Sequence, residues 1–249
     1  MIYIIKNVVR KQIRNRTIMI IAILALILTS LIITGDGLKI NGKEVLEFDS
    51  KLKVTVSLVI FFASMLTIFL SMNIIPQEFK EKTSHLILVR PIVKWQYMLA
   101  LVLGNLIVSL IILGVLSCSI IVLLIFFGKL ELLFRLIITL LILGLNIGII
   151  STTVSIVSIK LPAIFAGLAG FVIYILGMMH NYLSTFSQLS ESIWWTKPLL
   201  ILTPDILGVQ QEAALFLSGR PINLHIILGL TIYLYLIFGG TFFLFPKEV

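Results

Sequence analysis

The sequence has little charge and almost no cysteine. Only 12% of its 249 residues are charged, and Cys118 is its single cysteine. One cysteine excludes an internal disulfide framework and any site with several cysteine ligands. No GxxxxGK(S/T) or HExxH sequence occurs, so the residues offer neither the phosphate-binding loop of an ATPase nor the zinc motif of a metalloprotease. We therefore expect no enzyme activity, no cofactor and no metal on this chain.

Apolar residues are abundant instead. They make up 59% of the chain, and the mean hydropathy is +1.17. This composition is typical of a protein made mostly of bilayer-spanning helices. We predict an all-α membrane protein that forms one transmembrane domain over residues 1–249, with no nucleotide-binding domain. Its six predicted spans are 17–34, 54–75, 97–127, 132–158, 161–179 and 226–245.

Three features of these spans concern their packing. Lys160 and Pro162 leave only a tight turn between the fourth and fifth spans, so those two helices should be antiparallel neighbours. The third run is longer than a bilayer needs, which indicates a tilted helix or one that begins at the interface. Small residues spaced by four let helix backbones approach closely. Such pairs are Ala163/Gly167, Ala166/Gly170 and Gly144/Gly148.

The basic residues predict the orientation of the chain. Lys and Arg near span ends are retained on the cytoplasmic side, and six spans put both termini on one face. That face carries 11 Lys and Arg against Glu78, Glu81 and Glu248, a balance of +8, whereas the other face carries eight basic and eight acidic residues. We therefore predict that both termini are cytoplasmic. The basic surplus suits anionic membrane lipid, and we expect no nucleic-acid partner.

Two further segments are predicted to lie at the membrane surface. Residues 1–16 form an amphipathic helix before the first span. Its apolar positions are Ile2, Ile5, Val9 and Ile13, and its basic positions are Lys6, Arg10 and Arg14. Residues 180–225 contain Trp194 and Trp195, which suit the headgroup layer. For this segment we expect either short helices that dip into the outer leaflet or an interfacial loop held by its aromatic residues.

The segment 76–98, PQEFKEKTSHLILVRPIVKWQYM, separates the second and third spans and is both charged and amphipathic. Its first half combines apolar with charged side chains. The apolar ones are Phe79, Leu86, Ile87 and Leu88, and the charged ones are Glu78, Lys80, Glu81 and Lys82. An apolar knob with a charged rim suits docking to another protein. The alternative is an ordinary interfacial loop whose basic residues only set the topology.

The order of these features resembles the permease subunits of type 2, export-class ABC transporters. The matching loop positions are Glu78, Phe79, Lys80, Glu81, Lys82, Thr83, Leu86, Leu88, Arg90 and Pro91, with the aromatic Tyr97 opening the next span. The likeness extends along nearly the whole chain, from the amphipathic first helix to the long outer segment before the last span. It implies a cytoplasmic coupling helix near 79–88 and outer or re-entrant helices before the sixth span.

The resemblance also implies a function and partners. The chain would be the membrane-spanning subunit of an ATP-driven transporter, an exporter, and would form the translocation pathway as a dimer with a second copy or a related permease. Separate ABC ATPase subunits would bind ATP and Mg²⁺ and drive the chain through the loop 76–98. The expected location is a bacterial or archaeal plasma membrane.

An ion- or solute-coupled carrier, or a channel that does not depend on ATP, is the alternative function. Such carriers normally keep ionisable residues deep in their spans, and the predicted span centres contain none. The polar residues there are neutral. The main candidates to line a pathway, or to hydrogen-bond between helices, are Asn105, Asn146, Ser151 and Thr152. An intramembrane protease or transferase would need a nucleophile motif that the sequence does not show.

Overall fold

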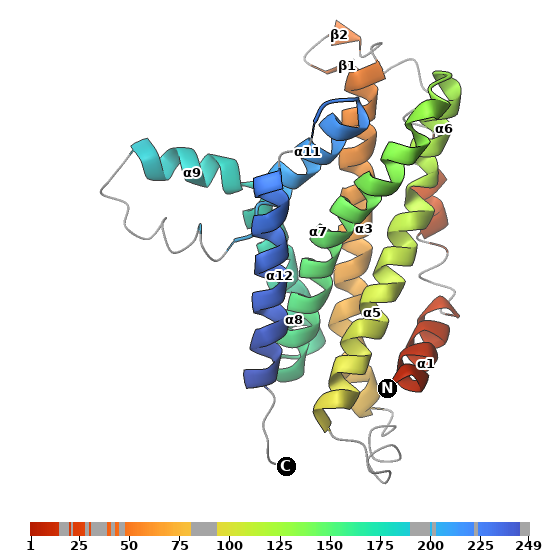
Figure 1. Ribbon diagram of the computed structural model, residues 1–249. Helices are drawn as coiled ribbons and strands as arrows, with labels where there is room; N and C mark the ends of the chain where they lie inside the picture. Colours follow the sequence, from red (N-terminus) through yellow and green to blue (C-terminus); the bar gives the residue numbers. More distant parts are fainter. Residues whose placement is uncertain are drawn as a thin grey trace.

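The computed structural model describes residues 1–14, 20, 22–27, 30, 39–40, 43–44, 48–80, 94–189, 200, 203–221 and 224–244, and nearly all of them are helical (Figure 1). The helices are α1 (Ile2–Ile13), α3 (Phe48–Lys80), α5 (Lys94–Leu116), α6 (Cys118–Phe126), η1 (Leu130–Leu132), α7 (Leu133–Lys160), α8 (Ala163–Met178), α9 (His180–Leu189), α11 (Ile206–Leu217) and α12 (Leu224–Leu244). Two short strands, β1 (Lys39–Ile40) and β2 (Lys43–Glu44), pair antiparallel.

Among the residues that the structure describes, three helical stretches are long and apolar enough to cross a membrane. They are Phe48–Glu78, Gln96–Phe126 and Leu130–Lys160, each of 31 residues. Shorter apolar helices are Ala163–Met178, Ile206–Leu217 and, within α12, Ile227–Ile237. The chain is therefore a helical protein of the membrane-embedded class, as its composition predicts. Most of the predicted first span, 17–34, lies outside the described residues.

Helix α3 is longer than the span predicted at 54–75. It has 33 residues, begins at Phe48 and continues through Pro76 to Lys80. The apolar run ends at Ile75, but proline removes only one backbone donor, and the helix persists past it. We call the end of the bundle where α3 ends and α5 begins the loop end, and the opposite end the far end. In Figure 1 the loop end is at the bottom.

The third apolar run, predicted at 97–127, is interrupted. Helix α5 ends at Leu116 and α6 begins at Cys118, and Ser117 donates its hydroxyl to the carbonyl of Gly114 at 2.6 Å. A hydroxyl that bonds back to its own helix competes with the regular backbone pattern. Helix α6 ends at Phe126, and the φ of 67° at Gly128 lets the amides of Gly128 and Lys129 bond back to carbonyls of its last turn. The chain reverses there into η1 and α7.

The prediction that the fourth and fifth spans are neighbours is confirmed. Helix α7 ends at Lys160, α8 begins at Ala163, and the two pack against each other and against α3. Glycine makes this packing close. A Cβ added at Gly170 would overlap the side chain of Val154 on α7 and lie 3.5 Å from Ile68 on α3. At Gly167 an added Cβ would lie 2.6 Å from the sulfur of Met72. The small residues of α8 therefore face α3 and α7 within this chain.

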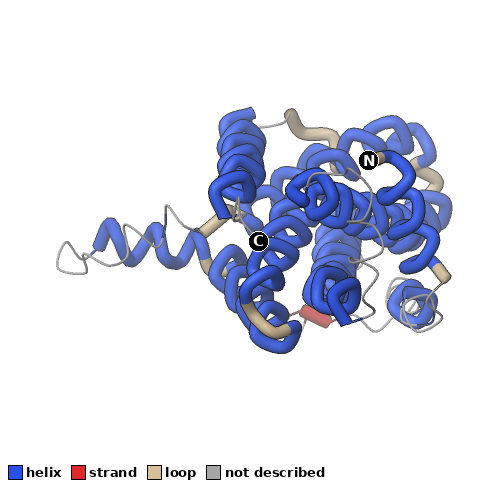
Figure 2. Tube along the Cα trace, turned by 90° about the horizontal axis from the view of Figure 1, so that it is seen from below, coloured by secondary structure: helices blue, strands red, loops and turns tan. Residues whose placement is uncertain are grey.

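The far end is closed by α11, which packs against α3, α7 and α8. Asp205 caps its first turn by accepting a hydrogen bond from the amide of Gly208 at 2.8 Å. Its last turn ends at Gly219, with φ 109°. Helix α9, in contrast, projects sideways from the bundle (Figures 1 and 2). The Trp194–Trp195 pair lies outside the described residues.

Helix α1 lies at the loop end against α5 (Figure 1). Ile4 and Val8 are its buried side chains, and a Cβ added at Gly104 of α5 would lie 2.8 Å from Val8. The apolar stripe predicted from the sequence does not pack on the bundle along its whole length, because Ile2 is 84% exposed and Ile13 42% exposed. One apolar edge of α1 thus packs on the bundle, while the ends of the predicted stripe remain at the surface.

Candidate functional site

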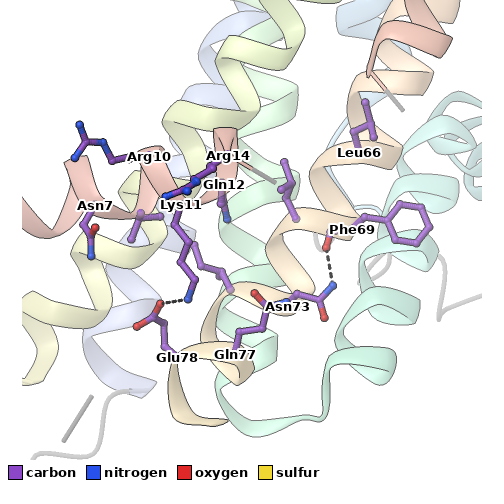
Figure 3. A pocket seen from close by; sticks show the side chains of 13 residues that line it. Asn7, Arg10, Lys11, Gln12, Arg14, Leu66, Phe69, Asn73, Gln77 and Glu78 are labelled. Atoms are coloured by element: carbon purple, nitrogen blue, oxygen red, sulfur yellow. Dashed lines mark hydrogen bonds and ion pairs between the residues drawn. The ribbon is translucent and has the colours of Figure 1, made fainter. Parts of the chain in front are cut away.

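The ends of α3 and α5 are joined to α1 by a cluster of three side chains, which we call the Glu78 clasp. One carboxylate oxygen of Glu78 accepts a hydrogen bond from the ammonium group of Lys11 at 3.0 Å (Figure 3). The other accepts one from the hydroxyl of Tyr97 at 2.9 Å. The Glu78 side chain is only 13% exposed, so its charge lies against protein rather than open solvent. The clasp therefore holds together the two helix ends that bracket residues 81–93.

The residues predicted to couple to an ATPase fall on both sides of the described boundary. Glu78 lies in the clasp, and Phe79 and Lys80 form the end of α3. The remaining seven, Glu81, Lys82, Thr83, Leu86, Leu88, Arg90 and Pro91, lie outside the described residues. The structure consequently positions the base of the predicted coupling segment through Glu78 and Tyr97.

A second polar cluster lies inside the bundle around Asn105 of α5, and we call it the Asn105 hub. The amide nitrogen of Asn105 donates to Ser71 of α3 at 2.6 Å and to Ser151 of α7 at 2.9 Å, with Ser155 at 3.4 Å. Its amide oxygen accepts from Gln12 of α1 at 3.2 Å. Asn105 and the three serines are fully buried. A single amide thus links four helices in a region from which water is excluded.

The clasp and the hub are joined through α1. Lys11 contacts Glu78, and the next residue, Gln12, contacts Asn105. Successive side chains on a helix point about 100° apart, so these two neighbours can reach different partners. The contact of Val8 with Gly104 fixes the distance of α1 from α5. A displacement at the ends of α3 and α5 would therefore act on α1 through Lys11 and on the buried hub through Gln12. Neither Lys11 nor Gln12 is marked by the sequence, which shows only an amphipathic helix.

Asn146 of α7, the other amide predicted as a candidate, lies in a different polar region. Its nitrogen donates to the carbonyl of Ile206 at 3.3 Å, but its oxygen has no hydrogen-bond partner among the described residues. One turn along α11, the side-chain amide of Gln210 is buried and lies close to the buried hydroxyl of Tyr174, without the geometry of a hydrogen bond to it or to another group in the described part of the chain. Buried polar atoms normally bind protein groups or ordered water. These three side chains from α7, α8 and α11 form what we call the Gln210 cluster.

The two small polar candidates on α7 have different surroundings. Ser151 belongs to the Asn105 hub. Thr152 is fully buried, and its hydroxyl donates to carbonyls of its own helix, Gly148 at 2.7 Å and Ile149 at 3.1 Å. This back-bonding satisfies the hydroxyl without a second helix.

The far end holds cations with aromatic rings and carbonyls. Lys129 lies 4.0 Å from the ring centre of Phe48, and Lys51, only 6% exposed, lies 5.8 Å from that of Phe127. Arg135 donates to the carbonyl of Phe216 in the last turn of α11 at 3.3 Å. A positive charge is favourable there, because the C-terminal end of a helix carries a partial negative charge. The sequence gives no indication that Arg135 anchors another helix.

Comparison with models of known protein families finds no match for this chain, and comparison with curated proteins finds no similar sequence.

Proposed function

We propose that this chain is the membrane-spanning subunit of an ATP-driven transporter, an exporter, whose ATP is hydrolysed by separate partner subunits. In this proposal the chain crosses the membrane six times, with the first span at 17–34 and both termini in the cytoplasm. It pairs with a second copy or a related permease in the plasma membrane of a bacterium or archaeon. The loop end then faces the compartment in which ATP is found.

The observation that carries this proposal is the Glu78 clasp. An ATPase that moves a loop can do work on a membrane bundle only if the ends of that loop are fixed to several helices. Glu78 and Tyr97 fix the two ends to each other, and Lys11 adds α1. Gln12 continues the connection to α5, and through the hub to α3 and α7. Movement of residues 81–93 would thus be transmitted to four helices through contiguous contacts.

The polar interior supports a transport role more generally. Buried hydroxyl and amide groups occur on α3, α5, α7 and α11, although an apolar core would be sufficient for stability. Such groups are costly to bury, and they can line a route for a polar or amphipathic molecule as well as hydrogen-bond between helices.

A carrier or channel that does not depend on ATP is the second candidate. The Gln210 cluster favours it, since buried polar side chains whose hydrogen bonds are not all satisfied within the described residues suit a hydrated passage between α7, α8 and α11. The two candidates differ in one respect that is simple to measure: only the first requires an ATPase partner.

The test is purification of the tagged chain from its native host in a gentle detergent, followed by mass spectrometry and an ATPase assay. We expect a P-loop ATPase in stoichiometric amount. Glu78→Lys reverses the charge of the clasp, and Phe79→Ala shortens the apolar side chain next to it, so both should reduce the bound ATPase while membrane insertion is retained.

Glu131→Lys is the matched control, because it makes the same charge reversal at an exposed position of η1 at the far end. This variant should retain the ATPase. Purification of the wild-type chain with no ATPase would contradict the proposal and favour the carrier or channel. Equal recovery of the ATPase with all four proteins would instead contradict docking through Glu78 and Phe79.

A further inference from the structure

A pocket opens beside the Glu78 clasp between α1 and α3. Its volume is about 700 Å³. Figure 3 shows the side chains that line it. Arg10, Lys11 and Arg14 line it from α1, and Glu78 is the acidic residue of its lining. Since Lys11 is paired with Glu78, the two arginines leave the lining with a charge of +2. Both arginines are exposed. A pocket of this kind attracts an anion.

The wall contributed by α3 changes character along its length. Toward the loop end the wall is polar, with Asn73, Gln77 and Glu78. Farther from the loop end along α3 it is apolar, with Leu66, Phe69 and Leu70. Glu78 and Leu66 are 12 residues apart, which corresponds to about 18 Å along a helix. The Phe69 side chain is 59% exposed. A soluble anion would use only the charged part of this surface, but an amphiphile would use all of it.

From these observations we propose that the pocket between α1 and α3 binds an anionic phospholipid. The phosphate lies within reach of Arg10 and Arg14, and an acyl chain lies along Phe69 and Leu66. Helix α1 is amphipathic, with Ile2 and Ile13 at its surface, so it lies where lipid headgroups and protein meet. Basic pockets between a surface helix and a span are a known way to hold anionic headgroups. The site does not depend on the transport role of the chain.

The experiment is native mass spectrometry of the full chain in detergent, titrated with dioleoyl phosphatidylglycerol or with dioleoyl phosphatidylcholine of the same acyl chains. We expect the anionic lipid to bind more tightly. Each arginine near the headgroup is worth roughly fivefold in affinity, so the double variant R10Q/R14Q should lose about 25-fold for phosphatidylglycerol and little for phosphatidylcholine. R10K/R14K should keep most of the preference, since it keeps the charge.

Lys6→Gln is the matched control. Lys6 is an exposed cation on the same helix, but it does not line the pocket. The K6Q variant should change the affinity for phosphatidylglycerol less than twofold. An equal loss with K6Q would show general attraction to a basic helix and overturn the site.

Two outcomes need only the wild-type chain, in case the double variant does not fold. Equal affinity for both lipids would contradict the proposal. Displacement of the lipid by inorganic phosphate would also overturn it, because the pocket would then recognise a soluble anion rather than a lipid.

Discussion

Replacing Asn105 with leucine is expected to lower the free energy of unfolding by about 2 kcal/mol. The substitution removes hydrogen bonds to Ser71, Ser151 and Gln12 and leaves those groups buried. Interhelical hydrogen bonds in membrane proteins average roughly 0.6 kcal/mol each, and the serine hydroxyls can recover part of the loss by bonding to their own helices. Thermal unfolding in detergent, followed by circular dichroism, measures the difference.

Asn73→Leu provides the control for the Asn105 variant. Asn73 is a half-buried asparagine on α3, and its side-chain amide donates to the carbonyl of Phe69 in its own helix at 3.1 Å. Asn73→Leu removes a hydrogen bond within one helix rather than between helices, and should change the free energy of unfolding by well under 1 kcal/mol. Equal destabilisation by the two substitutions would mean that the hydrogen bonds of Asn105 to other helices add nothing to the stability.

Gly170→Leu is expected to destabilise the chain by about 3 kcal/mol, the upper part of the usual range for overpacking. The Cβ alone would overlap Val154, and the rest of the leucine would have to enter the space between α7 and α3. Helix propensity works in the opposite direction, since leucine gains up to about 1 kcal/mol over glycine in a helix. The steric term is the larger of the two.

Gly229→Leu makes the same change where there is room. Gly229 is exposed on α12, and a Cβ added to it meets no atom within 4 Å. This variant should be neutral or slightly more stable than the wild type. If Gly170→Leu were equally well tolerated in the same unfolding assay, α7 and α8 could not pack as closely as Gly170 and Val154 indicate.

The sequence predicts the helical class and the pairing of α7 with α8 well, because both depend on local signals. Long apolar runs identify the membrane helices, and a turn as short as that between Lys160 and Ala163 leaves few geometries. Helix boundaries are less well predicted. Composition changes at Ile75, but backbone hydrogen bonds continue to Lys80. The break at Ser117 has no sequence signal apart from the run Ser117-Cys118-Ser119 among apolar residues.

Side-chain partners are the part that the sequence does not supply. It identifies Asn105 as an amide that needs a partner, but not that the partners lie on α1, α3 and α7. Gln12 and Gln210 show why, since each is an ordinary polar residue until the packing of a short helix places it inside the bundle. Lys11 likewise belongs to a run of basic residues, and only the fold distinguishes it as the partner of Glu78.

The proposed function requires the Glu78 clasp to face the cytoplasm, and cysteine labelling measures this directly. Cys118→Ser gives a background without cysteine. Single cysteines then replace Gln77 at the loop end or Glu131 at the far end, both of which are exposed. With a membrane-impermeant maleimide on intact cells, we expect labelling of position 131 and none of position 77, and the reverse in inside-out vesicles. Labelling of position 77 from outside the cell would contradict the orientation on which the coupling to ATP depends.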